Sequence, residues 1–104
     1  MNVWGDLARS GPPAATLTDL YTVPAATQLV GIVRAVNRAA KTTFRVSVAP
    51  GGAADNIDQY SAYDAALEMS TRDDLVIAAG PGDVIRVYNT LSTVTFTMFG
   101  VLKT

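Results

Sequence analysis

The last third of the chain has the most constraining pattern in the sequence. Between residues 93 and 98, threonines alternate with apolar side chains. This period of two is typical of a β-strand with one buried face. Beyond Thr97 both faces become apolar, so the strand must be covered on both sides, by a second sheet and a loop or by another copy of the protein. The short polar turn before this segment predicts that residues 83–89 and 93–102 are neighbouring strands.

Turn signals divide the rest of the chain into pieces of strand length. Pro24 ends the first piece, and Pro50-Gly51-Gly52 ends the third. Residues 59–67 fit helical spacing or a strand, and we assign them to a strand because of their aromatic content. The expected strands are residues 19–23, 29–38, 42–49, 59–67, 74–79, 83–89 and 93–102. Spacing of this kind predicts an all-β chain, an antiparallel β-sandwich similar to a jelly roll, with about seven or eight short strands.

The first sixteen residues show no strand pattern, and Gly11-Pro12-Pro13 interrupts regular pairing. We therefore expect residues 1–16 to form an extended N-terminal arm and residues 17–104 to form a single β-sandwich domain. A terminus of this kind is ordered only when something holds it. Trp4 and Leu7 would anchor the arm on a neighbouring subunit or another partner, and the alternative is that the arm folds back over its own sheet.

The segments 29–38 and 42–49 predict a subunit interface. We expect them to pair as a hairpin through a short turn at Ala40-Lys41, with Gly31, Val33, Ala35, Asn37, Phe44, Val46 and Val48 facing the core. The opposite face then mixes aliphatic and arginine side chains, too apolar for solvent and too charged for a core. The expected interface residues are Val30, Ile32, Arg34, Val36, Arg38 and Arg45.

Residue composition argues against catalysis. The chain has 104 residues, with no histidine and no cysteine. A disulfide framework, a thiolate nucleophile and a Cys/His zinc site are therefore excluded, and the commonest general base is missing. The acidic residues are dispersed, and nothing in their spacing selects a catalytic pair such as Asp64 and Glu68. We expect no enzymatic activity, no cofactor and no bound metal.

The balance of charged and apolar residues indicates an assembly component. Charged residues make up 16% of the chain and hydrophobic residues 49%, so part of the surface should be covered in an oligomer. The net charge is −1 and the arginines are scattered, so nucleic-acid binding is not expected. No leader pattern and no stretch near the ~20 apolar residues of a membrane span occur, so we expect a soluble product without membrane binding.

Two further sets of residues have alternative interpretations. Tyr60 and Tyr63 could form an aromatic platform for sugar together with Trp4, whereas the more ordinary interpretation packs Tyr60, Tyr63 and Tyr88 in or at the edge of the sandwich. Asp73-Asp74 and Asp83 are expected to hydrogen-bond the backbone of turns, as aspartates commonly do.

Several strand-and-turn motifs together resemble a group of small virion proteins from tailed bacteriophages. These motifs are LYTVPA at 20–25, NR at 37–38, TFRVSVAP at 43–50, GDVIRVY at 82–88 and FTMFGV at 96–101. The resemblance covers the chain from about residue 8 onward, and it includes no catalytic signature. Arg34 departs from it, because that group is expected to have an apolar residue there.

The resemblance implies a jelly-roll or β-sandwich accessory protein of the phage head or tail, often trimeric. The expected function is then a capsid decoration or cement protein, made in the host cytoplasm and located in the virion. Its expected partners are its own copies, as a homotrimer, and other virion proteins such as the major capsid protein. The alternative function is a tail-fibre or spike domain that binds host-surface glycan.

Overall fold

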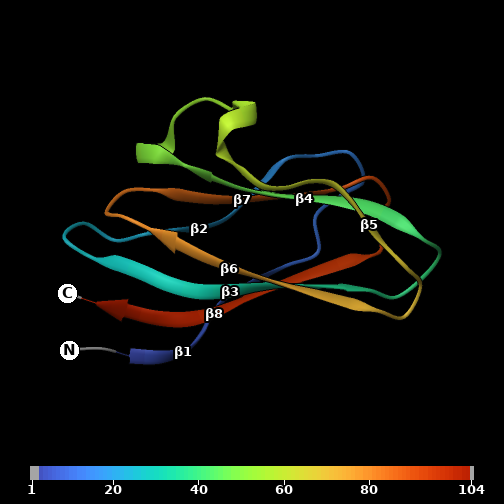
Figure 1. Ribbon diagram of the computed structural model, residues 1–104, viewed down its shortest axis with the longest axis horizontal. Coiled ribbons are helices and arrows are strands. Elements are labelled where there is room, and N and C mark those ends of the chain that lie inside the picture. The colour runs from blue at the N-terminus through green and yellow to red at the C-terminus, as the bar shows by residue number, and fades with distance from the viewer. Residues whose placement is uncertain (1–2, 104) are drawn as a thin grey trace.

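Two four-stranded antiparallel sheets make up the computed structural model, which describes residues 3–103, with side chains from Gly5 onward (Figure 1). The strands are β1 Val3–Ser10, β2 Thr18–Thr22, β3 Gln28–Asn37, β4 Thr42–Ala49, β5 Tyr60–Leu67, β6 Arg72–Ala79, β7 Val84–Asn89 and β8 Val94–Lys103. The first sheet has the order β1-β8-β3-β6, and the second has the order β2-β7-β4-β5. These bounds lie within one or two residues of the seven expected strands.

The strands form nested antiparallel pairs around one central hairpin. β4 pairs with β5 across residues 50–59, which contain the short 3₁₀ turns η1 (Pro50–Gly52) and η2 (Ile57–Gln59). Outside this central hairpin, β3 pairs with β6, β2 with β7 and β1 with β8, and successive pairs alternate between the sheets. This nesting is typical of a jelly roll. The expected all-β, jelly-roll-like sandwich is confirmed.

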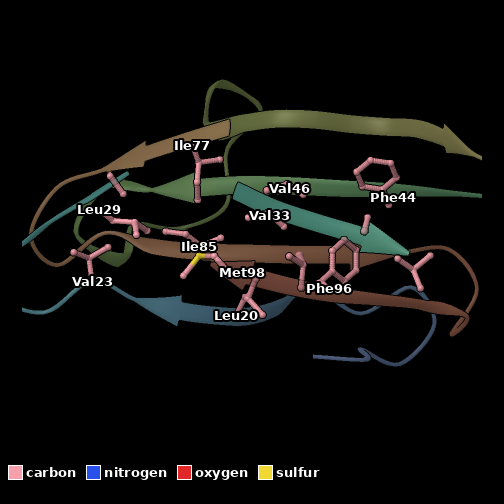
Figure 2. Close-up of a cluster of buried hydrophobic side chains, with 14 of the residues drawn as sticks. Leu20, Val23, Leu29, Val33, Phe44, Val46, Ile77, Ile85, Phe96 and Met98 are labelled. Carbon is pink, nitrogen blue, oxygen red and sulfur yellow. The ribbon is translucent and has the colours of Figure 1, made fainter. Parts of the chain in front are cut away.

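The core lies between the two sheets and is built by alternate residues of each strand. Figure 2 shows Phe44 of β4 and Phe96 of β8 at one end of the core, and Val23 and Leu29 at the other. The rings of Phe44 and Phe96 come from different sheets, with centroids 6.2 Å apart and planes tilted by 57°. Both phenylalanines are fully buried, so their contact joins the two sheets at this end of the core.

Two expected pairings are wrong, although the expected faces hold. β3 lies in the first sheet and β4 in the second, so residues 29–38 and 42–49 do not form a hairpin. β7 and β8 are likewise in different sheets. The expected core residues of β3 and β4 are buried, except that Val48 is only partly buried. The inner faces of β3 and β4, and those of β7 and β8, instead meet across the core from opposite sheets. The alternation of buried and exposed residues is compatible with either arrangement.

The expectation of an arm outside the sheet is also wrong. Residues 3–10 form β1, an edge strand paired with β8, and Leu7 packs against the core. The segment thus folds back on its own sheet, as in the alternative interpretation. Its alternation is hidden in the sequence because the register shifts between Asp6 and Ala8, as in a β-bulge. The anchor role expected for Trp4 lies outside the described side chains.

One buried side chain, that of Asn37, joins three connections at one end of the sandwich: β3–β4, β5–β6 and β7–β8. Its amide nitrogen donates to the carbonyl oxygens of Ala40, Leu67 and Glu68, at 3.0, 3.1 and 3.2 Å. Its amide oxygen accepts from the Ala39 amide and the Thr93 hydroxyl. A buried amide with all these partners fixes where the loops leave the strands.

A pair of glycines lets β3 and β8 approach closely in the middle of the first sheet. Gly31 and Gly100 are directly opposite each other and both are buried. A Cβ on Gly31 would lie 2.6 Å from the carbonyl oxygen of Phe99, and one on Gly100 would lie 2.5 Å from that of Val30. Because these contacts are with backbone, no side-chain rotation could relieve them.

We expect Gly31→Ala to lower the free energy of unfolding by about 1–3 kcal/mol, because the added methyl group must push β8 away. Gly5→Ala is the matched control: Gly5 also pairs with Gly100, but a Cβ there has no neighbour within 4 Å. Urea unfolding of both variants measures the difference. Equal stabilities of the two variants would contradict the close approach of β3 and β8.

Candidate functional site

The outer face of the first sheet has an exposed apolar half. Val30 pairs with Val101 and Ala78, and Ile32 pairs with Phe99 and Val76. We call this set the apolar patch, and its members are Val30, Ile32, Val76, Ala78, Phe99 and Val101. Val76 is 76% exposed and Val30 is 49% exposed, although both are β-branched aliphatic residues. Adjacent apolar residues that remain exposed on a sheet mark a contact surface.

The other half of the same face is charged. Arg34 forms a two-pronged ion pair with Asp74 on β6, with Nε–Oδ1 and Nη2–Oδ2 distances of 2.8 and 3.2 Å. Its guanidinium carbon also lies 5.2 Å from the centroid of the Phe99 ring. The hydrogen bonds from Arg34 hold the pKa of Asp74 below its ordinary value. Asp74 therefore does not serve a turn, because β6 begins two residues before the expected start.

The expected interface residues are divided between two surfaces. Val30, Ile32, Arg34 and Val36 lie together on the outer face of β3. Arg38 follows the end of β3, is exposed, and donates from Nε to the Thr93 carbonyl oxygen at 3.4 Å. Arg45 is on β4, so it lies on the second sheet. The expectation that Arg45 shares the face of β3 is wrong, because it depended on the hairpin that does not form.

Sequence reasoning missed the partners that complete the apolar patch. Phe99, Val101 and Val76 come from β8 and β6, the neighbours of β3 in the sheet. The doubly apolar end of the last strand is the signal that pointed to Phe99 and Val101. Only the pairing of β3 with β6 and β8 could show that these residues surround Ile32 and Val30.

On the outer face of the second sheet, Arg45 is enclosed by aromatic rings. Its guanidinium carbon lies 4.2 Å from the ring centroid of Tyr63 and 4.3 Å from that of Tyr88. Asp64 holds it with two hydrogen bonds, Nε–Oδ1 at 2.7 Å and Nη2–Oδ2 at 3.2 Å. The hydrogen bonds to Asp64 raise the pKa of Arg45 above its ordinary value. With Tyr60, these residues form what we call the Arg45 cluster.

A β-bulge in β5 builds this arrangement. Phe44 pairs with Ala65 and Val46 pairs with Ala62, so Tyr63 and Asp64 together oppose Arg45. Asp64 has a φ of 49°, in the left-handed region that a non-glycine residue rarely adopts. Such a conformation costs on the order of 1–3 kcal/mol and persists only where its surroundings enforce it. Here the ion pair with Arg45 opposes that cost.

Tyr60 extends the cluster toward the loop of residues 50–59. Its ring is perpendicular to that of Tyr63, with centroids 5.0 Å apart and an angle of 88°, and its hydroxyl donates to Asp55 at 2.7 Å. Burial first, and then the hydrogen bond to Asp55, raise the pKa of Tyr60 to about 12. The three tyrosines thus gather on an outer face, and Tyr63 is 49% exposed.

The described residues offer little for metal or acid–base chemistry. Among residues 3–103, no three His, Cys, Asp or Glu side chains are grouped so that they could hold a metal ion. Asp64 and Glu68 are each paired with a different cation, Arg45 and Lys41. Asp83 accepts hydrogen bonds from the Gly51 and Gly80 amides, so its expected role in turns is confirmed. No helix in this part of the chain has the length and apolar character needed to span a membrane.

Comparison with known protein families, with curated proteins and with solved structures finds no match for this chain.

We expect the Tyr60 phenol to keep its proton until about pH 12 in the folded protein. The folded state binds this proton more tightly than the unfolded state, whose tyrosine pKa is about 10. The resulting stabilisation is complete below about pH 10 and is lost as the pH rises through about 12. Ultraviolet titration of phenolate absorbance, compared with Tyr60→Phe, identifies the group.

In the same titration, Asp55→Asn should lower the pKa of Tyr60, because it removes a charged acceptor. Asp58→Asn is the matched control, since Asp58 lies in the same loop and its carboxylate makes no hydrogen bond to Tyr60 among the described residues. A Tyr60 that ionises at the ordinary tyrosine value in the folded protein would contradict this geometry.

Proposed function

We propose that this protein is a non-enzymatic structural component of a bacteriophage virion, a capsid decoration or cement protein. It stabilises the particle through contacts with its own copies, as a homotrimer, and with other virion proteins such as the major capsid protein. It is made in the host cytoplasm and is incorporated into the virion. The phage origin is supported by the resemblance of the strand-and-turn motifs to small virion proteins.

The apolar patch is the single observation that carries the contact part of this proposal. A small protein that acts alone in water gains nothing from leaving Val76 and Val30 exposed beside Ile32. In an assembly the same side chains are covered, and burying each large aliphatic one contributes about 1.5–3 kcal/mol. The ion-paired half of the face supplies orientation, because Arg34 and Asp74 must meet compatible charges on the partner.

Cementing a particle requires buried area rather than an active site. An interface of standard size buries about 1,600 Å² in total, and three linked subunits multiply its affinity by avidity. A rigid sandwich with one apolar outer face meets this requirement without catalytic residues.

In sedimentation experiments at tens of micromolar, we expect the purified protein to form an oligomer, with a trimer favoured. Val76→Asp should weaken self-association by about tenfold or more, because it places a charge in the apolar patch. Ile57→Asp is the matched control: Ile57 is 62% exposed but lies in η2, in the loop of residues 50–59. A monomeric wild-type protein, or equal effects of the two variants, would contradict self-association through this face.

The virion role is tested on particles. Phage particles purified from cells that carry the gene should contain this chain in a fixed ratio to the major capsid protein, as measured by quantitative mass spectrometry. Electron cryo-microscopy of those particles should place its density on the capsid. Purified particles that lack the chain would contradict the proposed function.

A further inference from the structure

We propose that the Arg45 cluster on the second sheet is a binding site for a neutral glycan. This surface lies on a different sheet from the apolar patch, and the proposal goes beyond the structural role argued above. Four observations carry it: the fixed geometry of the aromatic rings, the local charge, the exposure of polar and aromatic groups at one place, and the position of the exposed aliphatic residues.

The geometry of the cluster is set before any ligand arrives. Arg45 is fixed by two hydrogen bonds to Asp64 and lies 4.2 Å and 4.3 Å from two tyrosine ring centroids. Tyr60 in turn contacts Tyr63 edge-to-face and is held by Asp55. Rigid aromatic side chains bind ligands at a low cost in conformational entropy, so this arrangement is suited to recognition.

The local charge selects an uncharged ligand. The guanidinium of Arg45 is paired with the carboxylate of Asp64, and a second carboxylate, that of Asp55, accepts the hydrogen bond from Tyr60, so the cluster and Asp55 together carry one net negative charge. The guanidinium already binds the Asp64 carboxylate at two points, and a phosphate or an acidic sugar would have to displace it. Anionic glycans and nucleic acid are therefore disfavoured here.

The exposed groups match the chemistry of a pyranose ring. Tyr63 is half-exposed and offers aromatic surface to the apolar C–H groups of a sugar. The side chain of Asp64 is 45% exposed, and Asp55 is also exposed, so both can accept hydrogen bonds from sugar hydroxyls. Aromatic surface beside a few fixed polar groups is the usual composition of a small-ligand site.

A protein partner fits this surface less well than a glycan. Protein contacts are centred on apolar anchors surrounded by a polar rim. The exposed aliphatic residues Val30 and Val76 lie on the first sheet, and two others, Ile57 and Leu91, lie in loops rather than on the outer face of the second sheet. Tyr63 is the one member of the Arg45 cluster among the large apolar side chains that are exposed in residues 5–103.

The test uses a printed array of neutral oligosaccharides with sialylated and sulfated glycans beside them, probed with fluorescently labelled full-length protein. We expect retention on neutral glycans. Tyr63→Ala should reduce the signal by about tenfold or more, whereas Tyr63→Phe keeps the ring and most of the binding. Met69→Ala is the matched control, since Met69 is 62% exposed and lies outside the cluster, between β5 and β6.

Circular dichroism of each variant first establishes that it is folded. Absence of binding to every neutral glycan, a preference for acidic glycans, or equal binding by wild type and Tyr63→Ala would overturn the proposal. A change of oligomeric state in Tyr63→Ala without any glycan binding would instead assign the cluster to a protein contact. Sedimentation of Val76→Asp and particle composition test the structural role separately, so the two proposals can fail independently.

Discussion

The fold depends most on the antiparallel pairing of β3 with β8 in the middle of the first sheet. It runs without a register shift from Gln28 opposite Lys103 to Asn37 opposite Val94. The contact joins segments that are far apart in the chain, so its loop-closure entropy must be overcome by the core that it creates. The glycine pair Gly31 and Gly100 allows the strands to come close enough for that core to form.

The composition of both outer faces follows from strand pairing: that of β3 with its neighbours in the first sheet, and that of β4 with β5 and β7 in the second sheet. In the first sheet, β3 brings Ile32 between Phe99 and Val76, which assembles the apolar patch from three strands. In the second sheet, β4 brings Arg45 between Tyr88 and the bulge of β5. The two faces differ in chemistry, one aliphatic and one aromatic with charge, so one sandwich presents two chemically different outer surfaces.

Polar contacts fix the paths of the loops at the ends of the sandwich, because apolar packing does not specify which way a loop runs. Asn37 satisfies carbonyl groups in two connections at one end. Asp83 binds the amides of Gly51 and Gly80 at two turns. Because an unpaired buried amide or carbonyl costs about 1–3 kcal/mol, alternative loop paths that break these bonds are disfavoured. A polar contact also fixes the backbone at the Arg45 cluster. There the ion pair with Arg45 opposes the cost of the left-handed backbone conformation of Asp64.

The sequence by itself determined the strands and their faces, because a period of two is local and readable in any strand. It placed Phe44 and Phe96 inside and Arg34 outside, and it predicted a contact surface on the aliphatic side of β3. The tertiary structure decided which strands are neighbours: it separated Arg45 from Arg34, added Val76 and Phe99 to the apolar patch, and placed residues 3–10 in β1. Alternation is a property of each segment alone, whereas neighbours are chosen by burial and pairing across the whole chain.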